Sequence, residues 1–131
     1  MSTSTSSRST VTTPLAPAAI GPYSQGVLVG DQLYVSGQIA IDPESGSMID
    51  GSIEEETERV LDNIGAILKA ASMNFENVVR CEVVMTDVND YAQINDVYGR
   101  YFNEHPPARQ AVQVEGLPRN ARVEISCIAV R

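Results

Sequence analysis

Lysine, histidine and tryptophan are almost absent from this 131-residue chain. Lys69 is the single lysine, there is one histidine and no tryptophan, and the formal net charge is −8. Binding to a phosphate backbone needs a basic surface, so this balance argues against a nucleic-acid partner. Lys69 falls outside the apolar stripe of a predicted helix. A Schiff-base amine must be desolvated, so we expect no lysine catalysis.

Metal and cofactor motifs are also missing. Cys81 and Cys127 stand in alternating patterns at positions shared with Val and Ile, so we expect buried, reduced thiols. His105 lies in a proline-containing turn, and no Cys/His cluster has the spacing of metal ligands. The sequence contains no glycine-rich phosphate loop and no dinucleotide fingerprint. We therefore expect neither a metal nor a cofactor.

No apolar run is long enough to span a membrane, and a composition of 43% hydrophobic and 20% charged residues is typical of a soluble globular protein. Residues 1–13 are rich in Ser and Thr and lack the apolar core of a secretory signal, so we expect a disordered tail. Residues 14–131 then form one domain. We expect a cytoplasmic protein. The alternative is that the acid-free tail is a targeting signal for mitochondria or another organelle.

Hydrophobic periodicity predicts an α+β order of elements. Ser52 and Glu55 have the capping-box spacing, so a helix begins there and runs to about Ser72. A second helix begins near Asn89 and stops before Pro106. Strands are predicted over residues 25–29, 32–36, 79–87, 108–114 and 122–130. The two helices can cover only one face of the resulting mixed sheet.

The other face of the predicted sheet needs a cover. In the strand over residues 79–87, the alternation places Val79 and Cys81 toward the helices. The open face is predicted to carry Val84, Ala111, Gln113, Ser126 and Ile128. This mixture is too apolar to be left exposed to water and too polar to form the core of a single chain. We therefore expect copies of the same chain to cover this face in a closed homo-oligomer. Arg109 and Glu124 are predicted on the same open face, which places a site between subunits.

Arg109 is the first candidate for ligand binding. It opens a run of small and apolar residues in an acidic chain, and a guanidinium is costly to desolvate unless it meets an anion. Its planar fork of donors matches a carboxylate, so we expect Arg109 to hold a small acid. The alternatives are structural ion pairs of Glu124 with Arg109 or with Arg122.

Several short motifs together resemble the RidA/YjgF family, whose members are also labelled endoribonuclease L-PSP. The motifs are Ile20–Gly26, Val35–Ile39, Pro107–Arg109, Leu117–Pro118, Val123–Ile125 and Ile128–Val130. They follow the family's order over residues 14–131. The resemblance implies a subunit similar to the trimeric kind of chorismate mutase, assembled as a homotrimer with a site in each cleft between subunits.

The resemblance also implies an activity, that of a 2-iminobutanoate/2-iminopropanoate deaminase. Such an enzyme hydrolyses reactive enamine and imine acids, such as 2-aminoacrylate and 2-iminobutanoate, to 2-keto acids and ammonia. By position, Arg109 would bind the substrate carboxylate, and Glu124 would orient the attacking water or accept its proton. Tyr23 and Ser36 would line the pocket and form hydrogen bonds with substrate or water. An imine carbon is already electrophilic, so this chemistry needs no metal, lysine or catalytic triad.

Three further positions are implied in substrate binding. Gly37 would let the backbone approach the ligand, the Ala111 carbonyl would assist Glu124, and Asn95 would be a neighbouring polar group. Many family members carry Cys, Ser or Thr where this chain has Ala111, so here only backbone groups can act. The loop over residues 105–109 is also shorter than in well-known deaminases of the family.

Other interpretations stay open. An endoribonuclease or translation-inhibitor role conflicts with the acidic charge and with the lack of a histidine pair or basic groove. A non-catalytic binder of small carboxylates, or a chaperone-like trimer, is the third interpretation. Structural roles are also open: an interface aromatic for Tyr23, a strand bulge for Ser36 and Gly37, and a helix-surface position for Asn95.

Overall fold

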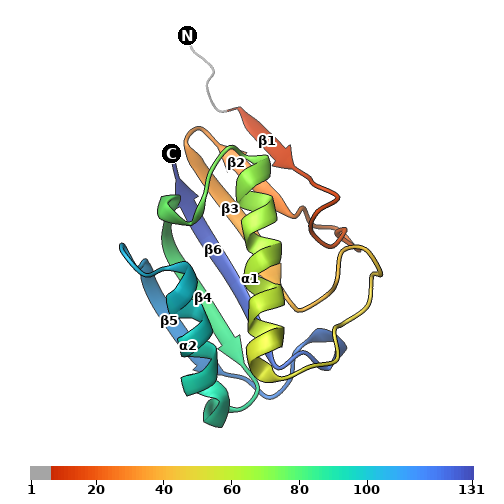
Figure 1. The fold of residues 1–131 in the computed structure, drawn as a ribbon. Helices are drawn as coiled ribbons and strands as arrows, with labels where there is room; N and C mark the ends of the chain where they lie inside the picture. The colour runs from red at the N-terminus through yellow and green to blue at the C-terminus, as the bar shows by residue number, and fades with distance from the viewer. Residues whose placement is uncertain (1–6) are drawn as a thin grey trace.

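The computed structural model describes residues 7–131, which form a mixed sheet with two α-helices packed on one face (Figure 1). The strands are β1 (Arg8–Val11), β2 (Gly26–Val29), β3 (Gln32–Gln38), β4 (Val78–Met85), β5 (Ala108–Gln113) and β6 (Val123–Val130). The helices are α1 (Ile53–Ala70) and α2 (Tyr91–Tyr101), with 3-10 turns η1 (Phe75–Asn77), η2 (Val88–Asp90) and η3 (Pro118–Asn120). The predicted α+β class is confirmed. Over the described range, no helix is both long and apolar enough to cross a membrane.

The strands follow the order β1-β2-β3-β6-β4-β5, and every neighbouring pair is antiparallel except β4 and β5. Parallel strands need a crossover connection, which η2 and α2 supply on the helix-covered face. The β2-β3 hairpin turns at Gly30 and Asp31, as predicted, and Gly30 has a φ of 60°. The topology therefore puts the C-terminal strand β6 between β3 and β4, in the interior of the sheet.

Helix α1 begins where the capping box predicts. The Ser52 hydroxyl oxygen accepts from the Glu55 N–H, and the Glu55 carboxylate accepts from the Ser52 N–H. Its stripe buried in the core includes Val60, Leu61, Ile64, Ile67 and Leu68. The helix ends at Ala70, short of the predicted end, because Ser72 already has a φ of 61°.

Helix α2 ends well before the prolines that the sequence analysis took as its limit. Its last residue is Tyr101, and Phe102 leaves helical geometry with a φ of −125° and a ψ of 57°. The ring of Phe75 lies 5.2 Å from that of Tyr101 and 5.3 Å from that of Phe102, in edge-on arrangements. These contacts fix the direction in which the chain leaves the helix.

Strand β1 corrects the expectation of a disordered tail over residues 1–13. Residues 1–6 lie outside the described range, but Arg8–Val11 pair with β2 and bury Val11 to 8% exposure. The β-branched Thr10 and Val11 favour a strand once β2 offers an edge to pair with. The Ser/Thr-rich composition alone did not reveal this pairing.

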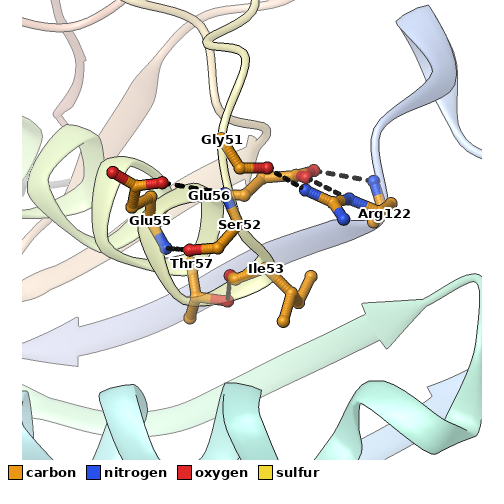
Figure 2. A network of polar contacts seen from close by, with 7 residues as sticks. All are labelled: Gly51, Ser52, Ile53, Glu55, Glu56, Thr57 and Arg122. Carbon is orange, nitrogen blue, oxygen red and sulfur yellow. Dashed lines mark hydrogen bonds and ion pairs between the residues drawn. The ribbon is translucent and has the colours of Figure 1, made fainter.

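An ion pair between a buried glutamate and a partly exposed arginine joins the start of α1 to the loop before β6 (Figure 2). Glu56 is 4% exposed; it accepts from the Arg122 Nε at 2.7 Å and from the Arg122 backbone N–H at 2.7 Å. Arg122 also donates to the Gly51 carbonyl at 2.6 Å. Arg122 is therefore engaged with Glu56, and the alternative pairing with Glu124 does not form.

The predicted alternation fails at the start of β4. A register shift between Val78 and Arg80 places Val78, 3% exposed, in the core and leaves Val79 48% exposed. Val79 therefore does not share the buried face with Cys81, contrary to the prediction. A bulge inverts the two-residue period, and nothing in the local sequence marks it.

In β5 the alternation holds but the predicted face is wrong, because three alternate side chains are paired with buried residues of β4. The register sets Arg109 beside Cys81, Ala111 beside Val83 and Gln113 beside Met85. Paired residues on neighbouring strands point to the same face. Ala111 and Gln113 therefore face the helices, not the open face. The open face instead carries Val84, Val112, Glu124, Ser126 and Ile128.

Candidate active site

Strand β5 and helix α2 build one part of the site, termed the arginine half-site: Arg109, Ala111, Tyr91, Asn95 and Tyr98. Arg109 donates from Nη1 to the Asn95 Oδ1 at 2.6 Å and from Nη2 to the Tyr91 hydroxyl at 2.7 Å. Tyr91 and Asn95 are four residues apart on α2, so they share a helix face. The Arg109 guanidinium carbon lies 4.8 Å from the Tyr98 ring centroid, a cation–π contact.

Arg109 keeps donors for a ligand. A guanidinium carries about five N–H donors, of which Asn95 and Tyr91 engage one each. A bidentate carboxylate needs only two more. No acidic side chain among residues 7–131 forms an ion pair with Arg109, so the alternative pairing with Glu124 does not form. A cavity of about 350 Å³, lined by Arg109, Tyr91 and Ala111 among others, opens beside it.

Strands β3 and β6 and the segment before β2 build the other part, termed the glutamate half-site: Tyr23, Ser36, Gly37 and Glu124. These four residues line one cavity of about 590 Å³. The rest of the wall is mostly apolar, but it also includes Gln38 and Arg119. Among residues 7–131, Glu124 forms no ion pair, with Arg119 or with any other cation.

Gly37 makes room for the Glu124 carboxyl group. A Cβ atom on Gly37 would lie 2.5 Å from the Glu124 Oε2, closer than any real contact. The pairing of β3 with β6 also shifts register between Val35 and Gln38, so Gly37 lies in the predicted irregularity of the strand. The strand irregularity and the close approach to Glu124 therefore occur at the same residue, Gly37.

Burial raises the pKa of the Glu124 carboxyl group above its ordinary value. Desolvation penalises the charged form, and no cation among residues 7–131 lies within ion-pair distance to compensate. A carboxyl group whose pKa is shifted toward neutrality exchanges protons more readily at physiological pH. The cavity therefore disfavours the charged form of the Glu124 carboxyl group.

Hydrogen bonds tie the segment that carries Tyr23 to itself and to Ser36. The Gln25 side chain, 2% exposed, donates to the Pro17 carbonyl at 2.7 Å and so fixes the segment on either side of Tyr23. Ser36 donates its hydroxyl proton to the Ser24 carbonyl, which leaves the hydroxyl oxygen as an acceptor. Tyr23 is 53% exposed at the cavity wall.

The two half-sites lie on opposite faces of the sheet, which corrects the prediction that Arg109 and Glu124 share a face. Arg109 is paired with Cys81 on the helix-covered face, whereas Glu124 is paired with Val84 on the open face. The two cavities have no lining residue in common. The fold therefore assembles each half-site within a subunit but does not bring Arg109 and Glu124 together.

Two residues of the arginine half-site, Tyr91 and Tyr98, are not among the site residues predicted from the sequence. Both contact the Arg109 guanidinium. The spacing of Tyr91 and Asn95 on one helix face was the signal that could have linked them. Nothing in the sequence showed that α2 packs beside the strand of Arg109.

One group of possible metal ligands occurs among residues 7–131. The ligand atoms of Glu76, Glu104 and His105 lie within 4.8 Å of one another, and all three side chains are exposed. The cluster includes no residue of either half-site. We assign it no role in the site.

The fold and the two half-sites define a class of protein: a small α+β domain with an arginine held by Asn95 and Tyr91 and, on the other face of the sheet, a glutamate in a mostly apolar cavity. Residues 13–131 match the model of the family described as endoribonuclease L-PSP, and the chain belongs to this family. The resemblance to RidA/YjgF proteins is thereby confirmed.

Named relatives cover nearly the whole chain. The 2-iminobutanoate/2-iminopropanoate deaminase of Bos taurus is 52% identical, with 95% of this chain and 90% of the relative aligned. The human deaminase of the same name is 47% identical over the same shares. Among solved structures, E. coli TdcF with bound serine is 40% identical, covers 94% of this chain and 98% of its own, and has a TM-score of 0.89. RidA from an Antarctic Psychrobacter is 42% identical, covers 94% and 99%, and has a TM-score of 0.90.

Proposed function

We propose that this protein hydrolyses 2-imino acids, and the enamine acids from which they form, to 2-keto acids and ammonia. The observation that carries the proposal is that Asn95 and Tyr91 orient Arg109, while no acidic side chain of the described range pairs with it. An arginine held in this way is prepared for a carboxylate ligand. The deaminase names of relatives at about 50% identity agree with this activity.

The reaction needs little from the protein beyond positioning. Arg109 binds the substrate carboxylate and so holds the imine carbon in place. Water adds to the carbon of the protonated imine while Glu124 takes one of the water protons, which gives a neutral carbinolamine. Glu124 returns that proton to the nitrogen. As the C–N bond breaks, the carbinolamine hydroxyl gives its own proton to Glu124, and the 2-keto acid and ammonia leave, the ammonia carrying the surplus proton as ammonium. Tyr23 and Ser36 orient the water or substrate, the backbone at Gly37 and Ala111 approaches the ligand, and Asn95 holds Arg109.

We further propose that the active form is a homotrimer with each site between two subunits. Arg109 and Glu124 lie on opposite faces of a subunit, so one ligand can reach both only if they come from different copies. The open face offers a surface for that contact, because it combines Val84, Val112 and Ile128 with polar groups.

The compartment remains part of the proposal. Cys81 and Cys127 are free and buried, which suits a reducing compartment such as the cytoplasm. Fluorescence microscopy of the full chain with a C-terminal tag would test this expectation. Co-localisation of the tag with an organelle marker would contradict it.

A coupled assay tests the activity directly. An amino-acid dehydratase generates 2-aminoacrylate or 2-iminobutanoate, and the release of keto acid is followed with wild type, Arg109→Ala and Arg100→Ala. Arg100 is a matched control, because it is a surface arginine in an exposed pair with Asp96. We expect wild type and Arg100→Ala to accelerate release and Arg109→Ala to lose at least about 100-fold in kcat/KM. Equal rates with and without wild type would refute the deaminase and favour a non-catalytic binder.

A further inference from the structure

We propose that Tyr91 is a positioning residue that fixes the guanidinium plane of Arg109 through its hydroxyl group. This inference rests on the proposed function, because it concerns the arginine that binds the substrate carboxylate. The Tyr91 hydroxyl lies 2.7 Å from Nη2, and the Arg109 guanidinium carbon lies 5.6 Å from the Tyr91 ring centroid. Neither the sequence motifs nor the roles implied by the family resemblance include this residue.

The geometry gives Tyr91 a task that Asn95 alone does not perform. Asn95 holds Nη1, but one hydrogen bond leaves the guanidinium free to turn about that contact. A second bond, from Nη2 to Tyr91, fixes the plane because it restrains the group at two points. The Tyr98 ring, 4.8 Å from the guanidinium carbon, supports the same group by a cation–π contact. Three N–H donors then remain in a defined orientation.

Strand β5 itself sets the place of Tyr91. The Val88 backbone N–H donates to the Gln113 Oε1 at 2.6 Å, so the chain entering α2 is tied to the strand that carries Arg109. Tyr91 is the first residue of α2, directly after η2. Gln113 and Arg109 point to the same face of β5. The hydrogen bond between Val88 and Gln113 therefore holds the start of α2, with the Tyr91 hydroxyl, beside the strand that carries the Arg109 guanidinium.

Tyr91→Phe tests the role, because it keeps the ring and removes only the hydroxyl group. Tyr101→Phe on the same helix is the matched control, since its hydroxyl donates to Asp62 and does not contact Arg109. We expect Tyr91→Phe to raise KM for the imine about 5- to 10-fold and to change kcat less than about twofold. We expect the Kd for 2-ketobutanoate, measured by calorimetry, to rise by the same factor. Tyr101→Phe should change none of these values.

A second comparison asks whether Tyr91 acts through Arg109. In an Arg109→Lys background, where the fork is gone, Tyr91→Phe should change the Kd for 2-ketobutanoate less than about twofold. If Tyr91→Phe leaves both KM and Kd unchanged, the inference about Tyr91 is overturned and the proposed deaminase activity stands. A loss confined to kcat would have the same meaning. If wild type binds 2-ketobutanoate without hydrolysing imines, the activity fails and the Kd comparison still decides the role of Tyr91. A wild type that does neither overturns both proposals.

Discussion

At the scale of single residues, Gly37 decides where the Glu124 carboxyl group can lie. Gly37→Ala would place a methyl group 2.5 Å from the present position of the Glu124 Oε2, so the carboxyl group must move. We expect kcat/KM to fall by at least about tenfold, because small displacements of a reacting group are costly. Steady-state kinetics measures the loss, and circular dichroism checks that the fold is retained.

Gly99→Ala is the control for this substitution. Gly99 lies in α2, and a Cβ atom there would meet no other atom within 4 Å. Alanine should raise the free energy of unfolding by about 0.5–1 kcal/mol and leave activity unchanged. Equal kinetics for Gly37→Ala and Gly99→Ala would contradict the close approach of Gly37 to Glu124.

The raised pKa of Glu124 also predicts a pH dependence of stability. A carboxyl group whose pKa is higher in the folded than in the unfolded state binds more protons when folded. Its contribution therefore favours folding at low pH and is lost as pH rises from the unfolded pKa through the folded pKa. The Glu124→Gln side chain does not titrate, so this contribution is lost with rising pH in wild type only. The free energy of unfolding of the variant, relative to that of wild type, should therefore rise between acidic and neutral pH.

Urea titrations at several pH values measure this difference. Glu82→Gln is a suitable control, because Glu82 is an exposed carboxylate of the same sheet. A relative stability of Glu124→Gln that falls with rising pH would mean that Glu124 is stabilised in its charged form.

At the scale of elements, the ion pair in Figure 2 anchors α1 to the chain that enters β6. Glu56→Gln keeps the shape of the side chain but removes the charge that two Arg122 donors face. We expect a loss of about 1–3 kcal/mol in the free energy of unfolding, since Glu56 is buried and Arg122 is partly exposed.

Asp96→Asn provides the comparison, because Asp96 and Arg100 form an exposed pair on α2 at 3.5 Å. Loss of this exposed ion pair should lower the free energy of unfolding by no more than about 0.5 kcal/mol. Chemical denaturation measures both variants. Losses of equal size would show that burial does not strengthen the Glu56 contact.

Elements were predicted from sequence where a signal is local. The Ser52 and Glu55 spacing and the Gly30-Asp31 hairpin each depend on a few neighbouring residues, and both predictions are confirmed. The end of α2 depends instead on contacts between its last rings and Phe75. Strand β1 likewise exists because β2 offers it an edge. Contacts between segments distant in sequence leave no periodic pattern to detect.

The same limit explains the prediction of the site. Residue identities pointed to Arg109 and Glu124, whose surroundings fit the proposed chemistry. Their relative placement required the register of β4 with both of its neighbours, and the parallel pairing with β5 puts Arg109 beside Cys81. A register that differs by one residue moves a side chain to the other face, so local alternation could not settle the question.

At the scale of the whole molecule, the half-sites on opposite faces predict complementation between inactive variants. Arg109→Ala and Glu124→Ala should each be inactive alone. After joint refolding, some sites would pair an intact Glu124 from one subunit with an intact Arg109 from the other. We expect random equal mixing to restore about a quarter of wild-type activity.

Mixing Arg109→Ala with the double variant Arg109→Ala/Glu124→Ala is the control, because no combination of these subunits regains Arg109. Activity in the first mixture alone would support a site shared between subunits. A mixture that stays inactive although light scattering shows mixed oligomers would contradict the shared site.

The placement of Arg109 and Glu124 on opposite faces has a genetic consequence. If each subunit contributes to two different sites, an allele that damages only Arg109 spoils one of them, and an allele that damages only Glu124 spoils the other. Two such alleles in one diploid cell would partly rescue each other. An allele that damages both residues would instead spoil two sites for each copy that enters an oligomer. Random equal mixing with the normal product would then leave about a quarter of the sites intact, against about half for an allele that damages one residue.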